Sequence, residues 1–193
     1  MHTMKKSLKP RMKKTDKLQT IYNRSLITRT LTLPMNAVSN NIDNILETNL
    51  SFSIEGKCIE EGFVKPGSVK LVTYSNGLLM RGNKVSFEVV FECMICYPVE
   101  GMLIQCVAQN ITKAGIKGVS SEEDPSPVII FIARDHNYNN DQFNKIEVGD
   151  KFSIRVIGQR FELNDKYISV IAEIVKPKAF KEPMNKPKIV IDS

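Results

Sequence analysis

Residues 84–119, KVSFEVVFECMICYPVEGMLIQCVAQNITKAGIKGV, place several strands in direct succession. The first part, 85–96, is a long apolar stretch rich in β-branched and aromatic residues, which predicts a buried strand. Pro98 interrupts it, and a second strand is predicted over 101–110. Lys113-Ala-Gly is a turn signal that leads into a return strand over 114–119. Because no linker separates these strands, we expect two small domains joined along one strand path, with a partner covering the edge of the apolar strand.

The chain before this run predicts an α+β domain with the element order β-α-β-β-β. Residues 25–33 alternate as a strand that Pro34 ends, and residues 36–49 carry an apolar helical face. Residues 60–67 are expected to form a loop, and Asn76-Gly77 is a hairpin turn signal. The helical face consists of Val38, Ile42, Ile45 and Leu46, and the remaining strands are predicted over 50–59, 68–74, 78–80 and 85–93.

From Tyr97 onward every predicted element is a strand. A hairpin over 101–119 is followed by strands over 128–133, 150–161 and 167–174, with an acidic loop over 120–127 and a polar loop over 135–144. Five short strands with these turns are typical of a small Greek-key barrel of the OB type.

The positive charge is concentrated at the two ends of the chain. The first seventeen residues hold seven of the 27 Lys and Arg and one of the 21 Asp and Glu, which leaves 20 of each sign for the rest. We therefore predict a disordered basic arm over 1–20 and an extended Pro- and Lys-containing tail over 177–193. The arm is either a solubilising segment or one that touches nucleic acid or an acidic protein surface.

The residues give no evidence of an enzyme, a cofactor or a metal site. There is no phosphate-binding or dinucleotide-binding glycine pattern. Cys93 and Cys96 form a C-x-x-C, but Cys58, Cys106, His2 and His136 stand at no zinc-ligand spacing from them, so buried thiols are expected. No run of 18 apolar residues is present, so no membrane partner is expected.

Five segments together resemble the stalk subunit of multisubunit RNA polymerases, which is the seventh subunit of eukaryotic polymerase II and has an archaeal counterpart called E-prime. The resemblance covers about 25–175, and its last two segments are similar to the S1 version of the OB barrel. The five are ITRTLTLP, IEGKC, VTYSNGLLMRGNKVSFEVVFEC, PVEGMLIQCVAQNITKAGI and GDKFSIRVIGQRFELNDKYISVIAEI.

This resemblance implies a tip domain over 21–96 that docks on the polymerase core and an S1 domain over 97–176 that faces the nascent transcript. It also implies a smaller partner subunit along both domains and no catalysis by this chain. A cellular source would place the protein in the nucleus, whereas a large DNA virus would place it in the host cytoplasm or virion. The alternatives are a stand-alone S1 protein of translation or RNA degradation, and an OB-fold enzyme acting on nucleic acid.

An OB barrel binds single strands through cationic and stacking side chains in a groove. Two positions depart from the S1 pattern, because Ile116 stands where an aromatic usually follows the turn glycine and Cys106 replaces a mid-strand glycine. We therefore expect weak, sequence-tolerant binding of single-stranded RNA. The predicted nucleic-acid-binding residues are Lys113, Lys117, Arg134, His136, Arg155 and Arg160, with Phe131, Tyr138 and Phe161 as possible stacking rings.

Overall fold

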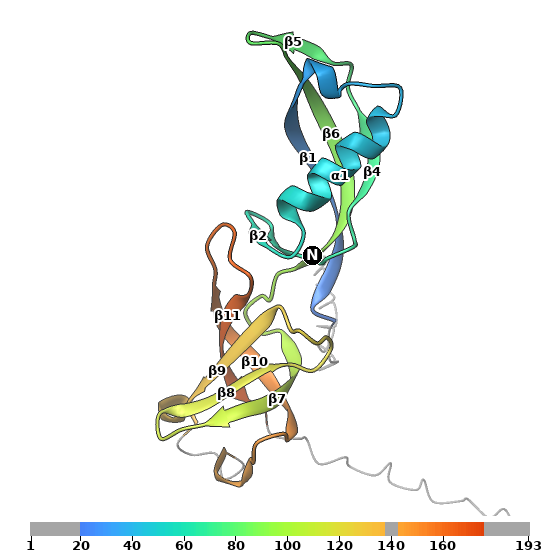
Figure 1. Ribbon diagram of the computed structural model, residues 1–193. Helices are drawn as coiled ribbons and strands as arrows, with labels where there is room; N and C mark the ends of the chain where they lie inside the picture. The colour runs from blue at the N-terminus through green and yellow to red at the C-terminus, as the bar shows by residue number, and fades with distance from the viewer. Residues whose placement is uncertain (1–19, 138–142, 176–193) are drawn as a thin grey trace, which may run out of the picture.

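The structure is a computed structural model that describes residues 20–137 and 143–175. Two sheets follow one another along an elongated molecule (Figure 1). The predicted basic arm, apart from Thr20, and the predicted tail lie outside the described residues.

The first sheet is built around β6 (Lys84–Cys96), which pairs with β1 (Tyr22–Pro34) along its whole length. On its other side β6 pairs in turn with β5, β4 and β3. The expectation that a partner covers an open edge of this strand is therefore wrong, since the chain pairs both edges itself. The remaining strands are β2 (Cys58–Ile59), β3 (Gly62–Val64), β4 (Lys70–Tyr74) and β5 (Leu78–Met80).

One helix, α1 (Ile42–Ile54), packs on one face of this sheet. Alternate residues of β6 face the helix, because side chains of a strand point to opposite sides in turn. Leu46 and Leu50 of α1 meet them in one hydrophobic cluster with no more than 6% exposure for any of its buried members. Those of β6 are Val85, Phe87, Val89, Phe91, Cys93 and Ile95.

The sequence placed this helix too early and a strand where its second half lies. Residues 35–37 form the 3-10 turn η1 (Met35–Ala37), and the predicted strand over 50–59 is wrong up to Ile54. Leu50–Ile54 alternates apolar residues with serine, which is the pattern of a strand, but the segment belongs to the helix. The helix ends at Ile54, and Gly56, with a φ of +69°, provides the left-handed turn that follows it. The predicted loop over 60–67 contains β3, and Val38 is exposed rather than part of the helical face.

The second sheet closes into a five-stranded barrel in the order β10-β11-β9-β8-β7. All its pairs are antiparallel except β9 and β11, which run parallel. This is an OB-like arrangement, as predicted; the S1 subtype remains a prediction. The strands are β7 (Leu103–Ile111), β8 (Gly115–Ser120), β9 (Val128–Ala133), β10 (Lys151–Arg160) and β11 (Ile168–Ile174), with 3-10 turns η2 (Arg134–His136) and η3 (Phe143–Lys145) between β9 and β10.

The alternation predicted for β11 is confirmed, because Ile168, Val170, Ala172 and Ile174 are all buried. They belong to the barrel's hydrophobic cluster, which also takes in Ile21, just before β1, and four residues of the first sheet: Tyr22, Cys58, Phe63 and Cys96. The two sheets therefore meet in a shared core. The division into domains at 96/97 remains a prediction.

Cys93 and Cys96 are both buried, as predicted for this C-x-x-C. Three residues apart on a strand, they face opposite sides and lie in different hydrophobic clusters. Burial raises the pKa of the Cys93 thiol to about 11 and that of Cys96 to about 12. Thiols this hard to ionise are poor nucleophiles and poor metal ligands.

Candidate nucleic-acid interface

The outward face of β8 and β9 brings a cation and an aromatic ring together. Lys117 on β8 stands opposite Phe131 on β9, and Phe131 stands beside Ile171 on the parallel strand β11. Phe131 is 46% exposed and Ile171 48% exposed. Because cross-strand partners share a face of the sheet, the three side chains form one continuous surface.

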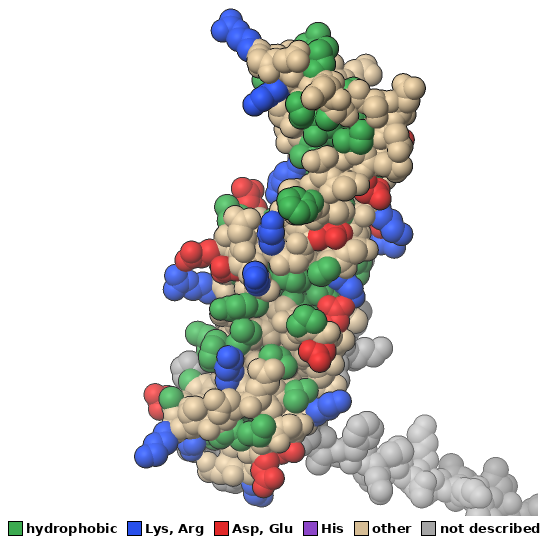
Figure 2. Space-filling view, in the orientation of Figure 1, with side chains coloured by type: hydrophobic (Ala, Val, Ile, Leu, Met, Phe, Trp, Pro, Cys, Tyr) green, Lys and Arg blue, Asp and Glu red, His purple; other side chains and the backbone are tan. Residues whose placement is uncertain are grey.

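A hollow of about 450 Å³ opens on this surface. Its lining includes Lys117, Phe131 and Ile171, with the polar side chains of Asn110 and Thr112 at the β7–β8 end. An exposed ring beside a lysine and two hydrogen-bonding groups is the combination that holds a stacked base next to its phosphate. Figure 2 shows hydrophobic and basic side chains interspersed on the barrel half of the molecule.

The turn that ends this hollow is specified by local chemistry. Thr112 donates its backbone N–H to the carbonyl of Gly115 at 2.8 Å, and the N–H of Gly115 donates to the Thr112 hydroxyl at 3.3 Å. A Cβ at Gly115 would overlap the carbonyl oxygen of Ile132, so only glycine lets β8 approach β9 this closely.

The position after this glycine points away from the interface. Ile116 is 2% exposed and belongs to the barrel core, so the exposed ring of this face comes from Phe131 instead. Cys106 on β7 replaces the usual glycine because its neighbour on β8 is a glycine instead. A Cβ at Gly118 would overlap the Cys106 sulfur. Both departures from the S1 pattern are thus accommodated inside the barrel.

Lys113 and Arg134 meet at the end of the barrel farthest from the first sheet. The Arg134 Nε donates to the carbonyl of Lys113 at 2.9 Å, and its guanidinium lies 4.8 Å from the centre of the Phe143 ring. Both side chains remain exposed beside the β7–β8 turn. His136 belongs to η2, but its side chain, like Tyr138, lies outside what the structure describes.

The other predicted cations lie elsewhere. Arg155 is on β10, which does not neighbour β8 in the barrel, and it forms an ion pair with Glu173 at 3.1 Å. Arg160 lies at the end of β10 nearest the first sheet and pairs with Glu162 at 3.2 Å. Phe161 packs edge-on against Tyr97 with centroids 6.0 Å apart. The six predicted residues therefore do not form a single patch, and Lys113, Lys117 and Arg134 are those gathered around the β7–β8 hairpin.

The sequence was compared with known proteins. No protein-family model matches it. A protein of Acanthamoeba polyphaga mimivirus is 27% identical over 173 residues, which cover 81% of this chain and 83% of that protein. Its name is "Putative DNA-directed RNA polymerase subunit".

This chain is similar to a viral protein that carries the name of a putative RNA polymerase subunit. The resemblance to an RNA polymerase subunit that the sequence showed is thereby confirmed, and the similar protein is viral. Among solved structures, the solution structure of GSP13 from Bacillus subtilis matches with a TM-score of 0.34 and 15% identity, over 50% of this chain and 74% of that one. A match this weak carries no argument about fold or function. Within the described residues, no helix is long and apolar enough to cross a membrane.

Proposed function

We propose that this chain is a non-catalytic stalk subunit of a viral DNA-directed RNA polymerase. Its first sheet docks on the polymerase core, and its barrel contacts the nascent transcript. The similarity to the mimivirus polymerase subunit over most of both chains carries this proposal. A polymerase of this kind works in the host cytoplasm or is packaged in the virion, so we place the protein there.

The docking surface is the end of the first sheet farthest from the barrel. β1 and β6 are each 13 residues long, so this end lies about 40 Å from the junction at about 3.4 Å per residue. Large apolar side chains are exposed there: Met35, Val38, Leu78, Leu79 and Met80, with Leu79 at 69%. Figure 1 shows β5 at this extremity. Clustered apolar side chains at an exposed tip favour a protein interface.

The smaller stalk partner is proposed to pack along β1. Among the described residues, β1 pairs only with β6, so its outer edge offers unpaired backbone groups along the whole strand. Such an edge is a template for an added strand or a covering element.

The barrel is proposed to bind single-stranded RNA at the surface around Lys117 and Phe131, with Lys113 and Arg134 at its margin. The assignment of Arg155 and Arg160 to RNA contacts is also a proposal, but each already has a carboxylate partner. Phosphate must compete with these carboxylates, so both should contribute less than Lys117.

The docking proposal is tested with the full chain carrying an affinity tag in cells that contain its polymerase. Leu79→Asp places a charge in the apolar tip and should abolish co-purification of the large polymerase subunits. Val148→Asp is the matched control, since Val148 is 65% exposed on the barrel, away from the tip. Undiminished recovery of the polymerase with Leu79→Asp would refute docking by the tip. Co-purification of ribosomes or exonucleases instead would favour a stand-alone S1 protein.

A further inference from the structure

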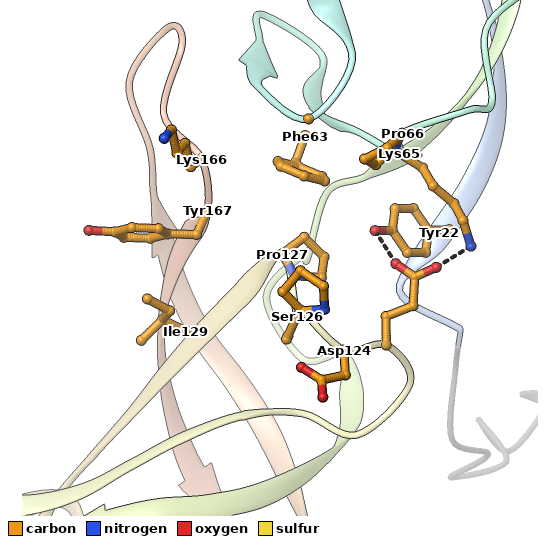
Figure 3. A pocket seen from close by; sticks show the side chains of 13 residues that line it. Tyr22, Phe63, Lys65, Pro66, Asp124, Ser126, Pro127, Ile129, Lys166 and Tyr167 are labelled. Atoms are coloured by element: carbon orange, nitrogen blue, oxygen red, sulfur yellow. Dashed lines mark hydrogen bonds and ion pairs between the residues drawn. The ribbon is translucent and has the colours of Figure 1, made fainter.

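A second hollow, of about 600 Å³, lies at the junction of the two sheets (Figure 3). Its walls come from both sides: Tyr22, Phe63 and Pro66 from the first sheet, and Pro127 and Tyr167 from the barrel. Aromatic residues and prolines make up about half of the lining residues, and most of the pocket's surface is apolar, although Lys65, Glu123, Asp124 and Lys166 also line it. The junction pocket is therefore shaped for apolar side chains.

One wall of the junction pocket is held by a hydrogen bond and an ion pair. The Tyr22 hydroxyl donates to Glu123 at 2.7 Å, and Lys65 forms an ion pair with the same carboxylate. The pocket thus exists before anything binds to it, which lowers the cost of filling it. By contrast, Lys166 at the rim forms no ion pair with any described residue.

An apolar track connects the junction pocket with the hollow beside Lys117. It consists of Ile129 and Phe131 on the outward face of β9, Ile171 on β11 and Tyr167 just before β11, with Ser169 beside Ile129. In the parallel register Phe131 stands beside Ile171, and Ile129 lies one outward position nearer the junction. Ile129 lines the junction pocket, and Phe131 and Ile171 line the other hollow. The track therefore runs along β11 toward the first sheet.

The chain itself has a segment that matches this surface. Residues 176–193 read KPKAFKEPMNKPKIVIDS, with three successive apolar residues, Ile189, Val190 and Ile191, followed by Asp192. We propose that this segment folds back along the apolar track, that Ile189–Ile191 occupy the junction pocket, and that Asp192 pairs with Lys166. The basic arm is a poorer occupant, because residues 1–17 contain no two adjacent apolar residues.

The length of the segment permits this path. Tyr167 precedes β11 directly, so the segment must return over the seven residues of β11, about 23 Å at about 3.3 Å per residue. The chain from Val175 to Ile189 reaches up to about 45–50 Å when extended, at about 3.3–3.6 Å per residue. Attachment also gives the segment an effective concentration on the order of millimolar at the pocket.

The absence of tryptophan from the chain allows a direct test. Val190→Trp in the full chain introduces a single indole, whose emission should be blue-shifted and several-fold less accessible to a soluble quencher than in a peptide of residues 176–193 bearing the same change. Ile129→Asp or Lys166→Glu, added to Val190→Trp, should return the emission toward that of the peptide. Val148→Asp is the matched control and should leave it unchanged.

The outcomes distinguish the possibilities. Peptide-like emission in the full chain, or emission indifferent to both Ile129→Asp and Lys166→Glu, would overturn the proposal. A blue shift that grows with protein concentration would place the segment on a second copy and would also overturn it. Circular dichroism shows whether Ile129→Asp still folds, and Lys166→Glu, at an exposed residue, provides the result if it does not.

Discussion

At the scale of single residues, Glu123 joins the two sheets. It accepts a hydrogen bond from the Tyr22 hydroxyl and pairs with Lys65, while its neighbour Glu122 accepts the backbone N–H of Ile21 at 3.1 Å. Burial alone would raise the pKa of Glu123, but the bonds from Lys65 and Tyr22 outweigh it and lower the pKa below its usual 4.5. Burial and the bond to Glu123 raise the pKa of Tyr22, so its hydroxyl stays a donor.

Glu123→Gln should destabilise the protein by about 1–3 kcal/mol at pH 7, because a hydrogen bond and an ion pair to a charged group are lost. A carboxyl whose pKa is lowered by folding stabilises above its unfolded pKa, and this stabilisation disappears as pH falls through the folded value. The difference between Glu123→Gln and the unchanged protein should therefore shrink below about pH 4.5. Urea unfolding at several pH values measures it. Glu162→Gln is the control, because Glu162 and its partner Arg160 are both more than 70% exposed, and it should have little effect on stability at any pH. A loss of stability equal to that of Glu123→Gln would contradict this account.

Phe131→Ala should weaken binding of single-stranded RNA about 5- to 150-fold, since a stacked base contributes about 1–3 kcal/mol. Phe161→Ala is the matched control, because that ring packs against Tyr97 and is not on the same face. Lys117→Ala should reduce the slope of log affinity against log salt by about one. Titrations at several salt concentrations, with a protein starting near Leu18, exclude the basic arm. Equal losses for Phe131→Ala and Phe161→Ala would remove the RNA site from this face.

At the scale of elements, several strands bounded by turns were predicted with the right bounds, whereas the helix was predicted but placed too early. The predicted bounds of β9, 128–133, match the observed strand because an apolar run lies between two polar loops. The alternating run Ser51-Phe52-Ser53-Ile54 at the end of α1 resembles a strand. The segment is nevertheless helical, because Leu46 and Leu50 are buried together against the sheet. The three-residue strand β3, which pairs with both β2 and β6, was predicted as part of a loop.

The candidate interface, too, could be predicted only in part from the sequence. Lys117 was predictable as an outward residue of a hairpin, but its pairing with Phe131 depends on which strands become neighbours. Arg155 has the same residue type and alternation, and the barrel order places it on a strand not adjacent to β8. Local pattern predicts which way a side chain faces, whereas topology decides what it faces.

The packing of α1 on β6 makes a prediction at this scale. Phe91→Ala should destabilise the protein by about 3–5 kcal/mol, because Phe91 is fully buried between the helix and the sheet. Phe52→Ala removes the same atoms from an α1 residue that is 86% exposed and should cost little. Chemical denaturation followed by circular dichroism compares them. Similar losses for the two would mean that α1 is rotated from the orientation described.

At the scale of the whole molecule, the hydrophobic core of the barrel includes residues that lie outside the barrel's own strands. Its cluster includes Ile21, which directly precedes β1, and Tyr22, Cys58, Phe63 and Cys96 of the first sheet. The β10–β11 loop also binds the first sheet through its backbone: the Cys58 N–H donates to the carbonyl of Asp165 at 2.7 Å, and the Asn164 N–H donates to the carbonyl of Cys58 at 2.8 Å. The elongated shape in Figure 1 is thus supported by one shared layer of core.

A barrel separated at the predicted boundary should therefore be much less stable than the same barrel in the full chain. A fragment of residues 97–175 loses the side chains of Tyr22 and Phe63 and leaves their apolar neighbours in water, at about 25 cal/mol per Å² of exposed surface. Thermal unfolding followed by circular dichroism should show a lower midpoint for the fragment than for a chain of residues 20–175, which should unfold in a single transition. Phe63→Ala in the longer chain is the matched intermediate case, because it empties one shared position without removing a strand. A fragment as stable as the longer chain, or two separate transitions in that chain, would show that the sheets fold independently and that the junction is only a contact between them.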